Sequence, residues 1–235
     1  MKISKLLTLA LLLSVLIISC EDEEATTTET GAIEFRMKYN GNDIELNETL
    51  VSPDGYNFKI DRFRFYLSSP EDQISADTFY NIDFSVSNPY TVPATTGSDS
   101  IRLGVGLDSD RNATTPADYL VTHPLADSDE YWSGWNSYRF LTIEGWTDLD
   151  GTPGWDQAYT YHIGVDQFYN QVTFPSTLGN TTTLNIHIDS ILFNPRDPID
   201  FETEFLTHTN LNNPQQAALT AKIMDLFLTS LEPNE

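Results

Sequence analysis

The fold class is read most directly from the stretch Thr183-Leu184-Asn185-Ile186-His187-Ile188. Its apolar residues occupy every second position, and Asn185 and His187 stand between them. Because successive side chains of a β-strand point to opposite faces, this alternation predicts a strand with one buried and one polar face.

Several other stretches are rich in β-forming residues and are separated by turn residues such as Asn, Gly, Pro and Asp. Many strands with this punctuation predict an all-β domain, an antiparallel β-sandwich with Greek-key-like connections. The predicted strands cover 32–39, 56–68, 79–86, 100–107, 138–146, 158–164, 171–177 and 182–193.

One helix is predicted near the C-terminus, where Asn213 can cap it and Pro214 fits its first turn. The folded part is expected to be a single domain over residues 31–231, with this helix closing over one sheet. The apolar residues expected to face that sheet recur at helical spacing: Ala217, Ala221, Met224, Leu228 and Leu231.

The N-terminus has the pattern of a removable bacterial signal. Lys2 and Lys5 precede 13 mostly apolar residues, Leu6 to Ile18, a run shorter than the roughly 20 needed to span a bilayer. Cys20, the only cysteine, follows a branched-then-small sequence that resembles a lipoprotein box. We therefore expect residues 1–19 to be a lipoprotein signal peptide and Cys20 to carry lipid; the alternative is a secreted protein with an unpaired cysteine.

Residues 20–30 are acidic and threonine-rich, a composition that predicts a solvated tether rather than a packed element. An acidic run directly after the lipid-bearing cysteine resembles the surface-export signal of Bacteroidetes lipoproteins, and a simple spacer is the alternative. The expected location is the outer membrane, facing the cell surface or the periplasm, with the lipid anchor as the only membrane contact.

The chain has a formal net charge of −23, which disfavours nucleic acid and anionic membrane surfaces as partners. It contains no GxSxG, HExxH or phosphate-binding glycine loop, and no second cysteine for thiol or zinc–cysteine chemistry. No nucleophile–base pair can be argued from the residues, so we expect a protein that is not an enzyme. The sequence identifies no protein partner.

Metal ligands are offered by four histidines and two acidic turns. Two histidines brought together by the fold would suit copper, zinc or iron, whereas a single one is more often a hydrogen-bonded structural residue. The acidic turns, 108–112 and 148–151, carry oxygen donors at alternate positions, as in part of a calcium loop, but lack its distal glutamate. Calcium is therefore an alternative ligand beside the simpler interpretation of ordinary turns.

The most distinctive segment is Glu130-Tyr131-Trp132-Ser133-Gly134-Trp135-Asn136-Ser137-Tyr138-Arg139-Phe140, which leads to Glu144-Gly145. So many aromatic residues beside a loop are unusual for a plain strand. They could pack the edge of the sandwich or stack on sugar rings, and the second interpretation predicts a binding module.

This segment resembles the hallmark of the MbnP-like family of copper-binding proteins, roughly M-Y-W-x-W-x-x-G-Y-x-F-x-x-x-E-G. Other stretches resemble the family in the expected order: 31–35, 58–68, 103–112, 162–164, and a histidine before the last helix. The resemblance covers most of residues 31–230. Two differences are Glu130 where the family usually has Met, and Met37 near the place of a first-strand histidine.

The resemblance implies a periplasmic or surface β-sandwich that holds one copper ion. It implies His162 and His208 as copper ligands, and Trp132 as the residue that some relatives oxidise to kynurenine, which then joins the site. Met37 is a candidate substitute ligand because a thioether suits Cu(I), although it could equally fill the core.

The sequence supports two hypotheses for the function. The first is a lipid-anchored extracytoplasmic protein that binds copper for its acquisition or handling. The second is a surface β-sandwich module that binds a glycan or a protein without metal. The copper hypothesis requires His162 and His208, which are far apart in the sequence, to lie together beside Trp132.

Overall fold

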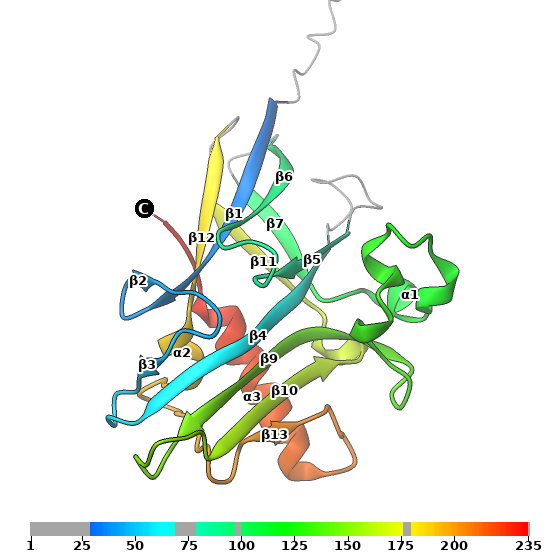
Figure 1. Ribbon diagram of the computed structural model, residues 1–235. Coiled ribbons are helices and arrows are strands. Elements are labelled where there is room, and N and C mark those ends of the chain that lie inside the picture. The colour runs from blue at the N-terminus through cyan, green and yellow to red at the C-terminus, as the bar shows by residue number, and fades with distance from the viewer. Residues whose placement is uncertain (1–28, 69–78, 97–99, 176–179, 235) are drawn as a thin grey trace, which may run out of the picture.

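The computed structural model describes residues 29–68, 79–96, 100–175 and 180–234, which form two β-sheets and a C-terminal helix (Figure 1). The predicted signal peptide, Cys20 and most of the predicted tether lie outside the described residues. Within the described part, no helix combines the length and hydrophobicity that crossing a membrane requires.

The small sheet has five strands among the described residues. They are arranged in the order β14-β12-β1-β2, and β6 also pairs with β1. The strands are β1 (Glu29–Tyr39), β2 (Asn42–Asp43), β6 (Tyr90–Thr96), β12 (Thr181–His187) and β14 (Leu231–Pro233).

The large sheet has nine strands within the described ranges and carries the polar surface considered below. Its main path is β11-β7-β4-β9-β10-β13; β3 and β5 pair with β4, and β8 pairs with β9. The strands are β3 (Leu50–Val51), β4 (Asn57–Ser68), β5 (Phe79–Asp83), β7 (Ser100–Val105), β8 (Tyr131–Trp132), β9 (Ser137–Asp148), β10 (Gln157–Gly164), β11 (Asn170–Pro175) and β13 (Leu206–Thr207).

The described ranges contain few helices, and only one of these is long. The α-helices are α1 (Ser109–Asn112), α2 (Ile188–Leu192) and α3 (Pro214–Ser230). Short 3₁₀ turns are formed by η1 (Pro116–Asp118), η2 (Pro124–Ala126), η3 (Ser128–Glu130) and η4 (Asp166–Phe168).

The core lies between the two sheets and under α3. On the inner face of the large sheet, Phe65, Leu141 and Ile163 are register partners on β4, β9 and β10, and all are buried. The ring of Phe65 lies 5.4 Å from that of Phe35 on β1 and 5.1 Å from that of Phe227 on α3. The sheets therefore touch directly, and α3 packs against the same apolar row.

The prediction of a mostly β protein with two sheets and a C-terminal helix is confirmed, but the sheets are mixed rather than purely antiparallel. β1 pairs with β12 in parallel, and so does β10 with β13. The antiparallel prediction is wrong at these two pairs. Alternation of apolar residues shows which face a strand buries. It does not show whether two strands that are far apart in the sequence pair in parallel or antiparallel.

Two local predictions also need correction. The strand predicted over 182–193 ends at His187, and α2 follows it. The capped helix is confirmed, because Asn213 accepts hydrogen bonds from the first-turn backbone of α3, but Ala221 on its predicted apolar stripe is exposed. The larger side chains decide which face α3 buries: Leu219, Ile223, Met224, Leu226 and Phe227.

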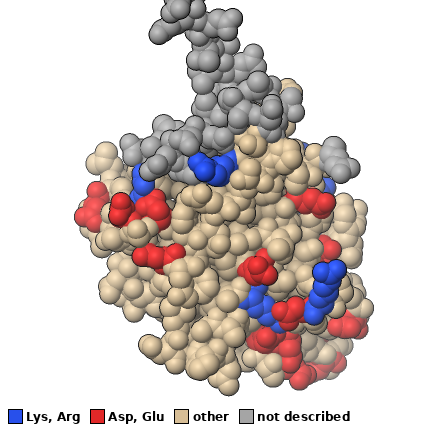
Figure 2. Space-filling view, turned by 180° about the vertical axis from the view of Figure 1, so that it is seen from behind, with Lys and Arg blue, Asp and Glu red and all other residues tan. Residues whose placement is uncertain are grey.

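The acidic excess of the sequence is visible on the surface. Figure 2 shows acidic side chains spread over the face seen from behind, with fewer basic ones among them. Buried acidic residues are the exception, and the most deeply buried one, Glu130, belongs to the site described next.

Candidate metal centre

Three segments meet on the outer face of the large sheet, at the end of β10. His162 lies on β10 opposite Thr142 of β9, in a row that points away from the apolar core. Trp132 ends β8, which turns back through Asn136 in the left-handed region (φ 52°) and pairs with the start of β9. His208 directly follows β13, which runs parallel to β10.

The structure brings the two predicted histidines and the predicted tryptophan into one ring cluster. The ring centroids of His162 and His208 are 4.7 Å apart. The Trp132 ring lies 4.9 Å from that of His208, edge to face, and 6.0 Å from that of His162. Trp135 stacks on Trp132 at 5.3 Å.

The two nitrogens of His162 have different surroundings. Its Nε2 lies 2.6 Å from Oε1 of Glu144, so this nitrogen carries the hydrogen and donates to the carboxylate. Its Nδ1 is buried and has no hydrogen-bond partner among the described residues. In the neutral ring this tautomer leaves a lone pair on Nδ1, which is the form that a metal ion can bind.

Glu144 and His208 both titrate below their ordinary values. The hydrogen bond from His162 lowers the pKa of Glu144, and the nearby Arg62 adds to the shift. Burial lowers the pKa of His208, and the charges of His162 and Arg139 lower it further. The site therefore favours an ionised carboxylate and a neutral His208 imidazole.

The segment that carries His208 is fastened to β10 by its neighbour in the chain. The hydroxyl of Thr209 donates to the carbonyl of His162 at 2.9 Å and accepts from the backbone N–H of Gly164 at 3.1 Å. Thr209 is buried and has a positive φ of 52°. These contacts hold the His208 ring beside β10, and the sequence alone gave no signal for them.

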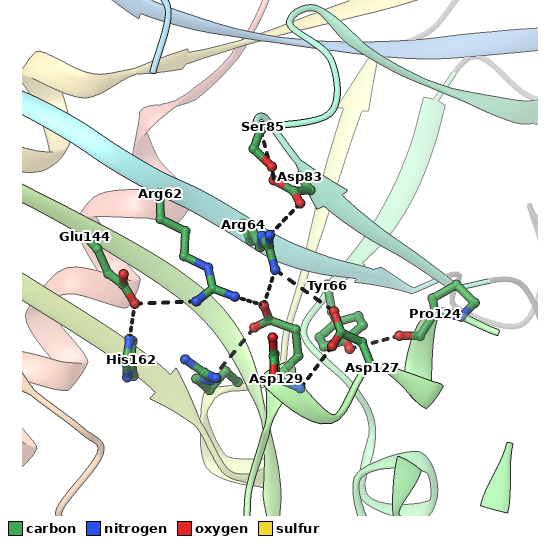
Figure 3. Close-up of polar contacts among 12 residues, drawn as sticks. Arg62, Arg64, Tyr66, Asp83, Ser85, Pro124, Asp127, Asp129, Glu144 and His162 are labelled. Atoms are coloured by element: carbon green, nitrogen blue, oxygen red, sulfur yellow. Dashed lines mark hydrogen bonds and ion pairs between the residues drawn. The ribbon is translucent and has the colours of Figure 1, made fainter. Parts of the chain in front are cut away.

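Glu130 anchors a charged network whose members Arg62, Arg64, Glu144 and His162 are labelled in Figure 3. Its side chain is only 1% exposed, and its Oε1 accepts from Arg62 at 2.6 Å and from Arg64 at 2.8 Å. Arg62 also lies 3.8 Å from Glu144, which in turn holds His162. An ionic chain thus runs from the buried Glu130 to the candidate ligand ring.

The structure explains why the residue after Glu144 in the distinctive segment is a glycine, Gly145. A Cβ atom at this position would collide with the carbonyl oxygen of Lys59 and with the hydroxyl of Tyr159. That hydroxyl donates to the same Lys59 oxygen at 2.9 Å. The glycine lets β9 pass close to both groups, which fixes the strand that presents Glu144.

Met37 is not brought to the ring cluster. It lies on β1, two residues after Phe35, and is fully buried in the apolar core. Because Phe35 contacts the inner face of the large sheet while His162 is on the outer face, that sheet lies between Met37 and His162. The surroundings of Met37 are those of a core residue.

The acidic turns differ from one another. Asp156, across the β9–β10 hairpin, lies close to Asp148 and Asp150. One carboxylate oxygen of each of the three lies within 4.8 Å of the others. In the turn at 108–112, Asp108 instead caps α1 and pairs with Arg111. The sequence pointed to both turns, but only the folded hairpin shows that Asp156 belongs with the first.

The metal-free protein is expected to lose stability as the pH falls. A group whose pKa is lower in the folded than in the unfolded chain binds fewer protons when folded, so acid favours unfolding. The loss begins below the ordinary histidine value of 6.5 for His208 and continues below 4.5 for Glu144. Urea unfolding at a series of pH values measures the free energy of unfolding. In His208→Gln this free energy should fall less steeply with pH just below the ordinary histidine value. An unchanged profile in that variant would contradict the assignment.

Comparisons with known proteins agree with this fold. The sequence model of the MbnP family matches residues 28–212. Among solved structures, MbnP from Methylosinus trichosporium is similar, with a TM-score of 0.50 and 15% identity over 69% of this chain and 77% of that chain. None of the curated proteins matches the chain. At this identity the structural likeness shows the fold alone, whereas the family match spans most of the sequence and confirms the resemblance: the chain belongs to the MbnP family.

Proposed function

We propose that this protein binds one copper ion between His162 and His208, beside Trp132, and that it serves the acquisition or handling of copper. The observation that carries the proposal is the buried Nδ1 of His162, which has no hydrogen-bond partner among the described residues although its ring lies 4.7 Å from that of His208. A buried polar atom without a partner is unfavourable, and a metal ion would satisfy it.

The donor chemistry fits copper. Neutral imidazoles suit this metal, and burial favours the neutral form of His208 by lowering its pKa. Glu144 holds the other nitrogen of His162, in the manner of the carboxylates that orient metal-binding histidines in proteins. The ring cluster opens on a cleft of about 480 Å³ that Trp132, Trp135 and His208 help to line, which gives an ion a route to the site.

The role of Glu144 provides the test. We expect the wild-type protein to take up one equivalent of copper, and Glu144→Gln to lower the affinity by about 10–100-fold, because the amide no longer fixes the His162 tautomer. Glu232→Gln is the matched control, since Glu232 pairs with the other strand histidine, His187, at 3.0 Å. Competition with a copper chelator measures both. Equal affinities for the Glu144 and Glu232 variants would argue against the site.

Trp132 is proposed to be the residue that undergoes oxidation to kynurenine, as the family resemblance implies. Written with O₂ and water as co-reactants and formate as the released product, the conversion adds about 4 Da by atom counting. Peptide masses of protein from copper-replete cells test it. An unmodified Trp132 in copper-loaded protein would show that the indole needs no conversion for binding.

The proposed location is outside the cytoplasm, on the outer membrane, with lipid on Cys20. The support is the sequence pattern around Cys20, which lies outside the described residues. Two or more acyl chains would hold the protein firmly on a membrane. Intact mass measurement is the test: a mature chain without acyl mass on Cys20 would contradict the anchor.

A second candidate function is supported by the same cleft. The stacked Trp132 and Trp135 form part of its wall, and stacked aromatic rings are a common surface for sugars. On this alternative the protein is a glycan- or protein-binding module without metal. Tryptophan fluorescence titrated with copper and with a glycan panel separates the two, since a response to sugars alone would favour the alternative.

A further inference from the structure

A second cluster of possible metal ligands lies at the other end of β10, on the β9–β10 hairpin. Asp148 is the last residue of β9, Asp150 lies in the turn, and Asp156 stands just before β10. The backbone N–H of Asp156 donates to the carbonyl of Thr147 at 3.0 Å, which closes the hairpin and sets Asp156 across from Asp148. One oxygen of each carboxylate then lies within 4.8 Å of the others.

The burial of Asp148 is an independent sign that this cluster is suited to bind a ligand. The residue is only 5% exposed. Its Oδ2 accepts from the amide of Asn57 at 3.2 Å, but its Oδ1 has no hydrogen-bond partner among the described residues. A buried carboxylate oxygen without a donor is costly, because it has lost water and gained nothing in exchange.

Among the described residues, no cationic side chain lies within ion-pair distance of these carboxylates. None of the three forms an ion pair in the part of the chain that the structure describes; the nearby Lys59 pairs with Asp61 instead. The backbone N–H and the hydroxyl of Thr152 donate to Oδ1 of Asp150 at 2.8 and 2.7 Å, which holds this carboxylate at the turn. The hairpin therefore gathers negative charge around one point.

We propose that Asp148, Asp150 and Asp156 bind a calcium ion. Ligands that are all carboxylate oxygens select a hard divalent cation over copper, which prefers imidazole or sulfur. Calcium accepts irregular arrangements of oxygens at about 2.3–2.6 Å, so oxygens on opposite sides of the ion are about 4.6–5.2 Å apart. Magnesium demands a tighter and more regular octahedron, which three carboxylates from one hairpin are less suited to supply.

The calcium site is separate from the copper site. Asp156 and His162 are six residues apart along β10, which corresponds to about 20 Å in a strand. Because the hairpin also contacts Asn57 of β4, the ion would fasten the ends of β4, β9 and β10 together. Its loss is therefore expected to lower stability without removing copper binding.

Titration of the mature protein with CaCl₂ after treatment with a chelator tests the proposal. We expect about one Ca²⁺ per chain with a Kd of about 10⁻⁴–10⁻³ M, the range of extracellular calcium modules. Tb³⁺ is a second probe, because Trp155 stands next to Asp156 and can sensitise its luminescence. Asp156→Asn keeps the oxygen that accepts from the backbone of Asp150, yet it should weaken binding about tenfold or more.

Two controls make the result decisive. Asp110→Asn changes an exposed residue of the other acidic turn and should leave Ca²⁺ affinity unchanged. His208→Ala should also leave it unchanged, which keeps this test independent of copper. Circular dichroism checks that each variant is folded, and Asp150→Asn replaces Asp156→Asn if the latter is not. Absence of saturable Ca²⁺ binding, or wild-type affinity in a folded triad variant, would overturn the proposal.

Discussion

Replacing His162 by alanine is expected to weaken copper binding by more than about 100-fold. Loss of a residue that only orients a ligand already lowers metal affinity about 10–100-fold, and removal of a ligand itself must exceed this. His162→Ala removes both the unpartnered Nδ1 and the ring that Glu144 orients. His208→Ala should have an effect of similar size, because its ring is the second member of the pair.

His187→Ala is the matched control for these variants. Like His162, His187 lies on a strand and contacts a carboxylate, Glu232, but its strand belongs to the small sheet. Affinity measured against a chelator of known strength should be unchanged in this control. Circular dichroism of all three variants shows whether the fold is kept. Copper affinity in folded His162→Ala within a few-fold of wild type would remove His162 from the site.

Glu130→Ala is expected to lower the free energy of unfolding by about 2–3 kcal/mol. The change leaves Arg62 and Arg64 without their shared acceptor on the outer face of the large sheet. Removal of one partner from a buried ion pair typically costs about 3–5 kcal/mol. The lower figure is expected here because both arginines are about one fifth exposed and keep a second carboxylate, Glu144 or Asp83.

Urea unfolding of Glu130→Ala measures this effect. Asp129→Asn is the control, since Asp129 is exposed in the same 3₁₀ turn, and its change should stay within about 0.5 kcal/mol of wild type. Glu130→Gln keeps an acceptor oxygen, so its free energy of unfolding should lie between those of Glu130→Ala and Asp129→Asn. A stability of Glu130→Ala indistinguishable from that of Asp129→Asn would show that the network contributes nothing to the fold.

Eight of the described strands were predictable because each of them leaves a local pattern: β1, β4, β5, β7, β9, β10, β11 and β12. The alternation around Ile186 located β12, and the turn residues located its neighbours. The parallel pairing of β1 with β12 was not predictable, because it joins segments that no turn connects. The short strands β8 and β13 left no pattern of their own, yet they place Trp132 and His208.

The ring cluster was anticipated through the family resemblance rather than through spacing in the sequence. His162 and His208 meet because β13 pairs with β10, a contact that no local pattern reveals. The function of Glu130 was equally hidden: in the sequence it stands where the family usually has Met, and the fold turns it into the acceptor for two arginines of β4. Met37 looked like a possible ligand until the faces of the large sheet were known.

X-ray absorption at the copper edge of the loaded protein tests the central claim most directly. We predict the scattering pattern of two imidazole rings bound to one copper ion, and the loss of one ring in His208→Ala. A copper ion surrounded by oxygen ligands alone, or a spectrum that His208→Ala leaves unchanged, would contradict binding between His162 and His208.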